Sequence, residues 1–357
     1  VKIINNYRYL MKVIYNELMI IKKEFGDNRK TEIILENKTP IINTKDLIKH
    51  EKVIITLSYQ GYIKYQKIDE YHLQHRGGKG KLTTKLKEND FIYKILIAYT
   101  HDNILLFSNI GKLYWLKVYN IPKFSRFSQG KPIINLLPLK KNEKITSLLI
   151  RNKYKDNSNL IMVTKKGIIK KTNLKKFNRS RRKGIIAIKL KKNDILIGVS
   201  IIDIKDKIML FTSQGKVVKF CETEVRSMGR NTMGVKGINI LKQKNDFVVS
   251  LTIIKPYFKG NIFTITENGY GKCTNNKLFP TRSRYTKGIL SMIINKRNGL
   301  LVGSLKVKQN NQVVIITNMG TLIRINISEI CVIGRNTKGV IIIKTKFNEK
   351  VIGLQKI

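Results

Sequence analysis

The fold is decided by a short stretch that recurs along the chain and reads IMLFTSQGKVVK at residues 208–219. It consists of an apolar run, a Thr, two further residues, a Gly and a second run rich in Val. This order is typical of a β-hairpin whose tight turn contains the Gly. The pattern occurs six times, at residues 53–61, 104–111, 160–167, 208–215, 262–269 and 313–320. The position three before the Gly always carries a hydroxyl, in Ser58, Ser108, Thr164, Thr212, Thr266 and Thr317.

A second Gly follows each hairpin and precedes another apolar run. These glycines are Gly80, Gly130, Gly184, Gly234, Gly288 and Gly339. Successive hairpin glycines are 50, 56, 48, 54 and 51 residues apart. A period of about 50 residues with about four strands per repeat is typical of propeller-like arrays of blades. We therefore predict an all-β fold of six blades over residues 51–357, closed or nearly closed into a disc.

The first 50 residues have a different pattern. Apolar residues recur there at helical spacings of three and four, in Tyr7, Leu10, Ile14, Leu18, Ile21 and Phe25. Gly26 stands where a C-terminal cap belongs, so we predict an α-helix over residues 1–26 with this stripe as its buried face. Residues 27–50 are polar, contain Pro40 and show no clear period, which predicts a linker.

The charge of the chain is strongly positive, with 70 Lys and Arg against 23 Asp and Glu and a net charge of +47. A field of this sign attracts polyanions, so nucleic acid is the first candidate partner and an anionic membrane surface the second. The chain is also rich in Lys, Ile and Asn, as an AT-rich genome would encode. The placement of arginine is therefore more informative than total charge.

The arginines are concentrated between the two glycines of each repeat. Those windows cover 118 of the 357 residues and hold 11 of the 15 arginines. In five repeats one Arg stands four residues before the second Gly, namely Arg76, Arg126, Arg230, Arg284 and Arg335. The third repeat has Ser180 at this position, between Arg179 and Arg181. Compositional bias cannot produce such a register, and these windows hold few carboxylates for ion pairs.

A guanidinium group donates two parallel hydrogen bonds to phosphate oxygens, so this register predicts one phosphate-binding loop per blade. Such contacts position a nucleic-acid backbone and do not read bases. A cationic rim around a disc predicts bent double-stranded DNA as the partner. The predicted rim residues outside the first repeat are Arg126, Lys131, Arg179, Arg181, Arg182, Lys183, Arg230, Arg284, Lys287, Arg335 and Lys338.

No pattern in the chain indicates catalysis, a metal site or a membrane segment. Cys221, Cys273 and Cys331 are far apart, which argues against a disulfide framework or a zinc site and favours the reducing cytoplasm. His72 and His75 have no carboxylate partner nearby and are interpreted as surface residues. No apolar run approaches the ~20 residues that span a bilayer. We expect no catalytic residue, metal or cofactor in this chain.

The first repeat contains a loop unlike the others, Gln74-His75-Arg76-Gly77-Gly78-Lys79-Gly80. Three glycines allow backbone amides to approach a phosphate closely, and the cations add charge. This segment resembles the Q-R-R-G-G-[RK]-G box of the DNA gyrase A family in six of seven positions, with His75 in place of an Arg. Residues 24–33, 87–92, 98–102 and 135–139 are also similar to that family, so the resemblance covers essentially the whole chain.

The resemblance implies a six-bladed β-pinwheel, a propeller relative in which strands are exchanged between blades. The preceding helix would be the end of the coiled-coil arm of the upstream cleavage domain. The implied role is to wrap DNA with positive handedness, so that a holoenzyme of two gyrase A and two gyrase B chains introduces negative supercoils. ATP, Mg²⁺ and the active-site Tyr would belong to other parts of that enzyme. The implied location is the cytoplasm, at the nucleoid.

Two other interpretations remain open from the residues. One is the corresponding tail of topoisomerase IV, with the same fold and a role in decatenation, which the box disfavours. The other is a propeller-type protein-interaction module, which the arginine register disfavours.

Overall fold

The computed structural model describes residues 2–33, 47–67, 81–82, 90, 92–125, 128–151, 158–179, 181–240, 245–346 and 348–356. The chain divides into two compact units, Val1–Leu47 and Ile48–Ile357. Each is described by itself.

The first unit contains α1 (Lys2–Asn5) and α2 (Tyr7–Phe25), which confirms the predicted helix. The Asn6 side chain caps α2 by accepting hydrogen bonds from the first backbone amides, and the Gly26 amide donates to the Lys22 carbonyl at the other end. The apolar stripe of α2 is exposed, whereas we expected it to be buried. The reason is that α1, of four residues, is the only other element in the described part of this unit.

The second unit contains six hairpins, as the repeat predicts. Their first strands are β1 (Lys52–Ser58), β5 (Asn103–Ser108), β9 (Asn159–Thr164), β13 (Lys207–Thr212), β17 (Asn261–Thr266) and β21 (Gln312–Thr317). Their second strands are β2 (Tyr62–Lys67), β6 (Lys112–Lys117), β10 (Ile168–Asn173), β14 (Lys216–Cys221), β18 (Tyr270–Asn275) and β22 (Thr321–Asn326). We number the blades 1 to 6 by these hairpins.

The hydroxyl of each hairpin explains why the repeat contains Ser or Thr at that position. In blade 1 the Ser58 Oγ accepts a hydrogen bond of 3.0 Å from the Tyr62 amide, across the turn. The Gly61 amide donates to the Ser58 carbonyl, and Gly61 has a φ of +93°, which favours glycine. The same pair of interactions recurs in blades 2, 3, 4 and 6, and in blade 5 the hydroxyl of Thr266 donates to the Tyr270 carbonyl instead.

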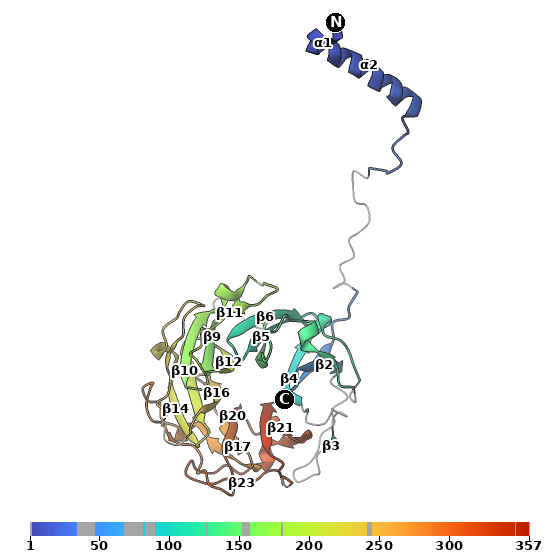
Figure 1. Ribbon diagram of the computed structural model, residues 1–357. Helices are drawn as coiled ribbons and strands as arrows, with labels where there is room; N and C mark the ends of the chain where they lie inside the picture. Colours follow the sequence, from blue (N-terminus) through green and yellow to red (C-terminus); the bar gives the residue numbers. More distant parts are fainter. Residues whose placement is uncertain are drawn as a thin grey trace. The chain divides into compact units, whose positions relative to one another are not determined.

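A third strand in each blade lies beside the first strand of the hairpin, toward the centre of the ring (Figure 1). These inner strands are β4 (Ile92–Tyr99), β8 (Ile145–Ile150), β12 (Leu196–Ile202), β16 (Val248–Ile254), β20 (Leu301–Val307) and β24 (Val351–Lys356). Each contacts the inner strand of the next blade, and β24 contacts β4. The ring of blades is therefore closed.

The fourth strand of each blade comes from the following repeat. In blades 1 to 6 these outer strands are β7 (Lys131–Pro132), β11 (Ile185–Ile186), β15 (Val235–Lys236), β19 (Ile289–Leu290), β23 (Val340–Ile341) and β3 (Lys81–Leu82). The last of them, β3, follows the box in sequence and pairs with β22 of blade 6. The predicted six-bladed pinwheel with exchanged strands is thus confirmed.

The hydrophobic core consists of layers between neighbouring blades. Along β1, Val53, Ile55 and Leu57 pack toward blade 2, while Ile54 packs toward blade 6. Both faces of the strand are buried, which explains why the repeat shows continuous apolar runs in place of alternation. The described buried residues of the layer between blades 6 and 1 are Ile54, Ile92, Ile95, Val314 and Ile316.

In repeats 2 to 6 the second Gly lies directly before the exchanged strand and packs against the preceding blade. Gly234 has a φ of +95°, and a Cβ there would lie 2.5 Å from the Ile169 carbonyl oxygen of β10. Replacing Gly234 with Ala should lower the free energy of unfolding by at least about 1–2 kcal/mol, from the left-handed conformation alone. Gly229→Ala is the matched control, since a Cβ at Gly229 meets nothing within 4 Å. Thermal melting of both variants measures the difference, and equal melting temperatures would contradict it.

Candidate nucleic-acid interface

The arginine-bearing segments of repeats 2 to 6 are loops that cross from one blade to the one before it. Each of these five loops starts at a short 3-10 helix after the second strand of its own blade and ends at the outer strand of the preceding blade. The 3-10 helices are η2 (Val118–Asn120), η4 (Leu174–Phe177), η5 (Glu222–Glu224), η7 (Asn276–Leu278) and η8 (Ile327–Glu329). The loops therefore follow one another along the outer edge of the ring (Figure 1).

Most of the predicted rim residues that the structure describes are exposed on these loops. The exposed ones are Lys131, Arg179, Arg181, Arg182, Lys183, Lys287 and Lys338. Arg230, Arg284 and Arg335, which share the register position four before the second Gly, are half-buried. Arg126 and the box, Gln74, His75, Arg76, Gly77, Gly78, Lys79 and Gly80, lie outside the described residues.

Two of the half-buried arginines connect neighbouring loops. A terminal nitrogen of Arg284 donates a hydrogen bond of 2.7 Å to the Lys236 carbonyl of β15, and Arg335 donates one of 3.2 Å to the Leu290 carbonyl of β19. Each bond uses one of the five N–H groups of the guanidinium and fixes its direction. The Arg284 Nε is buried, but the terminal nitrogens of both side chains carry further donors for an anion, so these side chains are held in place without being neutralised.

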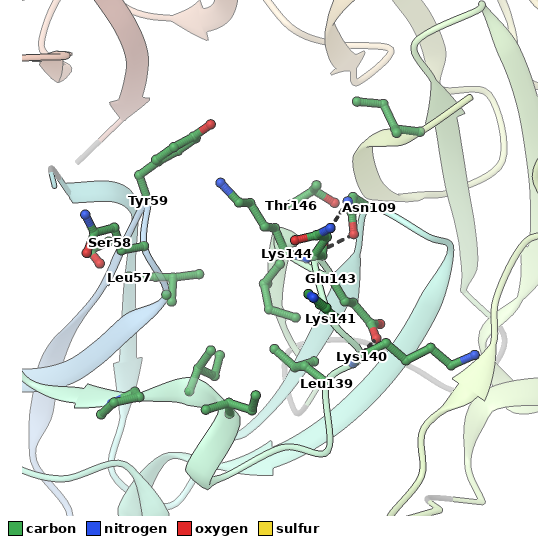
Figure 2. Close-up of a pocket in the computed structure, with 18 residues that line it drawn as sticks. Leu57, Ser58, Tyr59, Asn109, Leu139, Lys140, Lys141, Glu143, Lys144 and Thr146 are labelled. Atoms are coloured by element: carbon green, nitrogen blue, oxygen red, sulfur yellow. Dashed lines mark hydrogen bonds between the residues drawn. The ribbon is translucent and has the colours of Figure 1, made fainter. Parts of the chain in front are cut away.

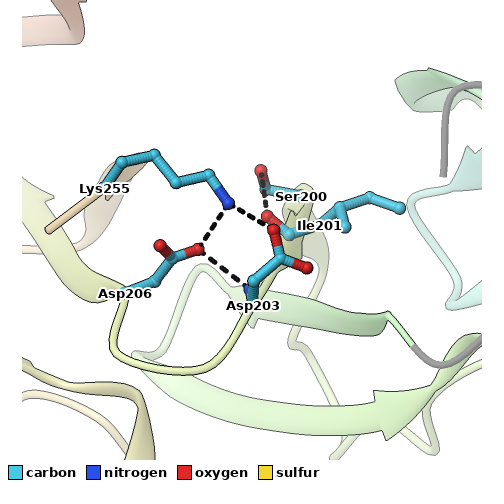
Figure 3. A network of polar contacts seen from close by, with 5 residues as sticks. All are labelled: Ser200, Ile201, Asp203, Asp206 and Lys255. Atoms are coloured by element: carbon cyan, nitrogen blue, oxygen red, sulfur yellow. Dashed lines mark hydrogen bonds and ion pairs between the residues drawn. The ribbon is translucent and has the colours of Figure 1, made fainter. Parts of the chain in front are cut away.

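Carboxylates do not compete for the rim arginines within the described ranges. The ion pairs found there are made by lysines, as between Lys171 and Glu222 at 2.5 Å. Figure 3 shows a second example, in which Lys255 lies between Asp203 and Asp206 at 2.5 and 2.9 Å. Burial lowers the pKa of Lys255, but hydrogen bonds to both carboxylates raise it above its ordinary value overall. These pairs leave the arginines available for an external anion.

Sequence reasoning missed a set of lysines that are buried inside the blades. Lys64, Lys170, Lys219 and Lys272 lie on the second strands of blades 1, 3, 4 and 5, and Lys170 and Lys272 are fully buried. The Lys272 ammonium donates to the Gly334 and Arg335 carbonyls at 2.8 and 2.5 Å. A signal existed in the sequence, because Lys interrupts an apolar run three residues after the hairpin Gly in repeats 1, 3 and 5.

Burial changes the protonation of these lysines. Burial is the larger cause that lowers the pKa of Lys170, Lys219 and Lys272 to about 8, and a nearby cation contributes in each case, as Arg335 does beside Lys272. The ammonium groups are therefore charged at pH 7 and become neutral within about a unit above pH 8.

Two cavities lie elsewhere in the second unit. One of about 610 Å³ is lined by residues from all six inner strands, at the centre of the ring. The other, of about 480 Å³, lies between blades 1 and 2, and Figure 2 shows Tyr59, Lys140, Lys141 and Lys144 around it. The Lys144 ammonium lies 3.5 Å from the centre of the Tyr59 ring, a cation–π contact. Neither cavity brings a nucleophile and a base together.

Within the described ranges, no group of three or more His, Cys, Asp or Glu side chains is placed to hold a metal ion. None of the helices there is both long enough and apolar enough to span a bilayer. The basic loops at the outer edge are therefore the best-defined candidate site.

Comparison with known proteins agrees with this assignment. Residues 52–97, 102–152, 158–203, 206–255, 260–308 and 311–357 match the family described as "DNA gyrase C-terminal domain, beta-propeller", one match per repeat. The A subunit of DNA gyrase from Buchnera aphidicola subsp. Baizongia pistaciae is 52% identical over 354 residues, which are 99% of this chain and 41% of that protein. The A subunit of DNA gyrase from Escherichia coli K12 is 48% identical over 334 residues, 94% of this chain and 38% of that protein. The chain thus spans about two fifths of the length of these relatives.

Two solved structures have the same fold. The C-terminal domain of DNA gyrase A superimposes with a TM-score of 0.76 at 25% identity and covers 86% of this chain and 100% of that one. The C-terminal domain of DNA topoisomerase IV gives 0.68 at 26% identity, covering 87% and 94%. Because all six repeats match the family and the gyrase A relatives are about 50% identical, this chain belongs to the DNA gyrase A C-terminal domain family.

Proposed function

We propose that this chain binds and wraps double-stranded DNA around the outer edge of its ring, with positive handedness. The observation that carries the proposal is the regular placement of basic loops, each crossing between two blades of a closed ring. Cations on the five described loops, spread along one circumference, favour a curved path for a polyanion. The chain contributes binding and bending, and we assign it no catalytic step.

The energy of bending sets a requirement that this arrangement can meet. DNA has a persistence length of about 50 nm, so a single tight turn costs on the order of tens of kcal/mol. Only contacts distributed along the whole path can offset such a cost, as arginines do in the nucleosome. Arginines with fixed directions, such as Arg284 and Arg335, suit this role because fewer side-chain rotations are lost on binding.

In the cell the chain would act together with the remainder of gyrase A and with gyrase B, in an A2B2 assembly. The wrapped DNA would be presented to the cleavage site so that strand passage introduces negative supercoils. ATP and Mg²⁺ would be used by other parts of that assembly, in the cytoplasm at the nucleoid. The resemblance of the box and the gyrase A relatives support these assignments.

Duplex binding should depend steeply on salt. Each neutralised phosphate contributes about 0.9 to the slope of log affinity against log salt, so one contact per loop gives a slope of about 5 or more. Fluorescence anisotropy with duplexes of unrelated sequence at several salt concentrations measures both the slope and the weak sequence preference. An affinity that barely changes with salt would contradict the rim interface.

The box should be needed for wrapping more than for affinity. Replacing residues 76–80 with alanine removes the cations of one loop, so we expect binding to weaken only modestly while the loops of the other repeats remain. The change in linking number after ligation of nicked circles on the protein should be lost. Negative supercoiling by the reassembled enzyme should be lost with it, while ATP-dependent relaxation survives.

The matched control removes a similar charge elsewhere on the rim. Arg179, Arg181 and Arg182 are exposed on the loop of repeat 3, and their replacement by alanine should weaken binding at least as much as the box variant. This control should retain part of the linking-number change, since β3, at the seam between blades 6 and 1, is untouched. An unchanged linking number in the box variant would remove these residues from wrapping.

A further inference from the structure

The blades alternate in the residue that lies beneath the neighbouring loop. Three residues after the hairpin Gly, blades 1, 3 and 5 carry Lys64, Lys170 and Lys272, all buried. Blades 2, 4 and 6 carry Tyr114, Val218 and Ile323 at the same position. At this one position the sequence therefore has a period of two blades, and only the odd-numbered blades carry a buried charge there.

Each of these three lysines donates hydrogen bonds to backbone carbonyls of the loop that follows it in the next repeat. Lys64 binds the Ser125 and Ser128 carbonyls at 3.1 and 2.7 Å. Lys170 binds the Thr232 carbonyl at 3.2 Å, and also the carbonyl of Arg230. These carbonyls flank or belong to the arginine register position of repeats 2 and 4.

The contacts of Lys272 are the most complete. Besides the Gly334 and Arg335 carbonyls, it binds the carbonyl and the hydroxyl of Thr337 at 3.3 and 2.9 Å. The Thr337 hydroxyl also lies 3.0 Å from the Gly334 carbonyl and closes the loop across Arg335. Repeat 4 has the same Gly-Arg-Asn-Thr sequence, and its Thr232 hydroxyl donates to the Gly229 carbonyl at 2.9 Å.

The corresponding residues of the even-numbered blades hold their loops in another way. The Tyr114 ring packs against Gly184 and its hydroxyl donates to Glu143. Val218 lies beneath Gly288. Neither supplies a charge to the loop above it. Lys219 of blade 4 binds the Asn276 and Phe279 carbonyls, at the start of the loop and five or more residues before Arg284.

We propose that Lys64, Lys170 and Lys272 are positioning residues for DNA binding, each fixing the arginine loop of the next repeat around its buried ammonium. The loops of repeats 2, 4 and 6 then have an ammonium beneath the arginine position. Those of repeats 3 and 5 have Tyr114 and Val218 there, and the repeat 5 loop receives the buried Lys219 ammonium only at its start. This inference rests on the proposed function and adds which loops determine the position of the duplex.

The physical basis is the direction of the loop backbone. Carbonyl oxygens that point inward to an ammonium leave the outer surface of the loop with less negative charge. The buried ammonium also adds a fixed positive charge beneath the arginine, which strengthens the field that a phosphate meets. Because the loop is already ordered, binding loses less conformational entropy there than at a loop that must take its shape on DNA.

A double-mutant cycle on the full chain tests this coupling, with a fluorescent duplex as the probe and anisotropy in a salt series as the readout. Arg335→Ala and Lys272→Met should each lower the salt slope by about 0.9, because each loses the same phosphate contact. The double variant should bind no more weakly than Arg335→Ala, a coupling of at least about threefold. Lys272→Met combined with Arg282→Ala, on the loop of repeat 5, should be additive. Additivity of Lys272→Met with Arg335→Ala would overturn the proposal.

If Lys272→Met does not fold, Thr337→Val still tests the proposal. This variant removes only the one hydroxyl that contacts both the Lys272 ammonium and the Gly334 carbonyl. Its matched control is Thr286→Val, at the same position of the repeat 5 loop. We expect Thr337→Val to lower affinity about twofold or more, in the range for one shared hydrogen bond, and Thr286→Val to leave it unchanged. Equal effects of the two variants would contradict the alternation.

The pH dependence separates positioning from a general loss of stability. With a pKa of about 8, Lys170 and Lys272 lose their protons between pH 7 and pH 9, so DNA binding by the unsubstituted chain should weaken several-fold over this range. In the unfolded chain these lysines have a pKa near 10.5, so above pH 8 they bind more protons than in the folded chain. Their titration by itself therefore raises the free energy of unfolding as pH rises. Binding should therefore weaken without unfolding, and the double variant Lys170→Met, Lys272→Met should show a flatter profile.

The outcomes distinguish this inference from the proposed function. If the chain fails to bind duplex DNA at any salt concentration, the proposed function is wrong. If it binds with the expected salt slope but the pH profile and the coupling are those of independent residues, only the positioning role is wrong.

Discussion

The exchange of the outer strand between repeats is the constraint on which the rest of the molecule depends. A two-residue strand such as β15 makes too few hydrogen bonds to be stable alone, and it holds its place because Gly234 lets its backbone press against β10. The loop before it starts on one blade and ends on another, so the ring fixes both of its ends. An arginine on such a loop cannot move independently of two blades. Strand exchange thus converts a row of sheets into a circle of fixed cationic loops.

The ring closes between blades 6 and 1, and the strand paired with blade 6 there follows the box in the sequence. β3 comes from repeat 1, follows directly after Gly80 in the sequence and pairs with β22 of blade 6. Among the described residues, Ile54, Ile92 and Ile95 of blade 1 pack against Val314 and Ile316 of blade 6 at this junction. The exchanged strand that links the last blade to the first repeat is therefore the continuation of the segment that resembles the gyrase box.

Local chemistry explains which features could be predicted from the sequence. The hairpins could be predicted, because a hydroxyl that bonds across the turn and a Gly with positive φ are both determined by residues close together in the sequence. The arginine register could be predicted, because equivalent residues of a repeat occupy equivalent positions in the blades. The buried lysines are marked in the sequence by a Lys within the second strand of repeats 1, 3 and 5. Their partners could not be predicted, since the carbonyls that receive Lys272 are about 60 residues further along the chain. The half-buried state of Arg284 was also missed, because its partner Lys236 lies in the neighbouring repeat. The exposure of the stripe on α2 was missed because periodicity shows a common face and not what covers it.

The charges of the ring are arranged so that the mutual repulsion of its rim cations can be relieved by an external anion. Carboxylates pair with lysines at turns and strand ends, as Asp203 and Asp206 do with Lys255, and no ion pair among the described residues involves a rim arginine. A buried ammonium is costly to desolvate, and three or more carbonyls offset that cost only where the loop closes around it, as at Lys272. Placing an ammonium beneath the arginine position only in blades 1, 3 and 5 limits this cost. A fixed cation loses little entropy when a phosphate arrives, whereas an exposed lysine must order its whole side chain. Specific placement, more than the total of positive charge, is what lets a small ring hold a stiff polymer in a curve.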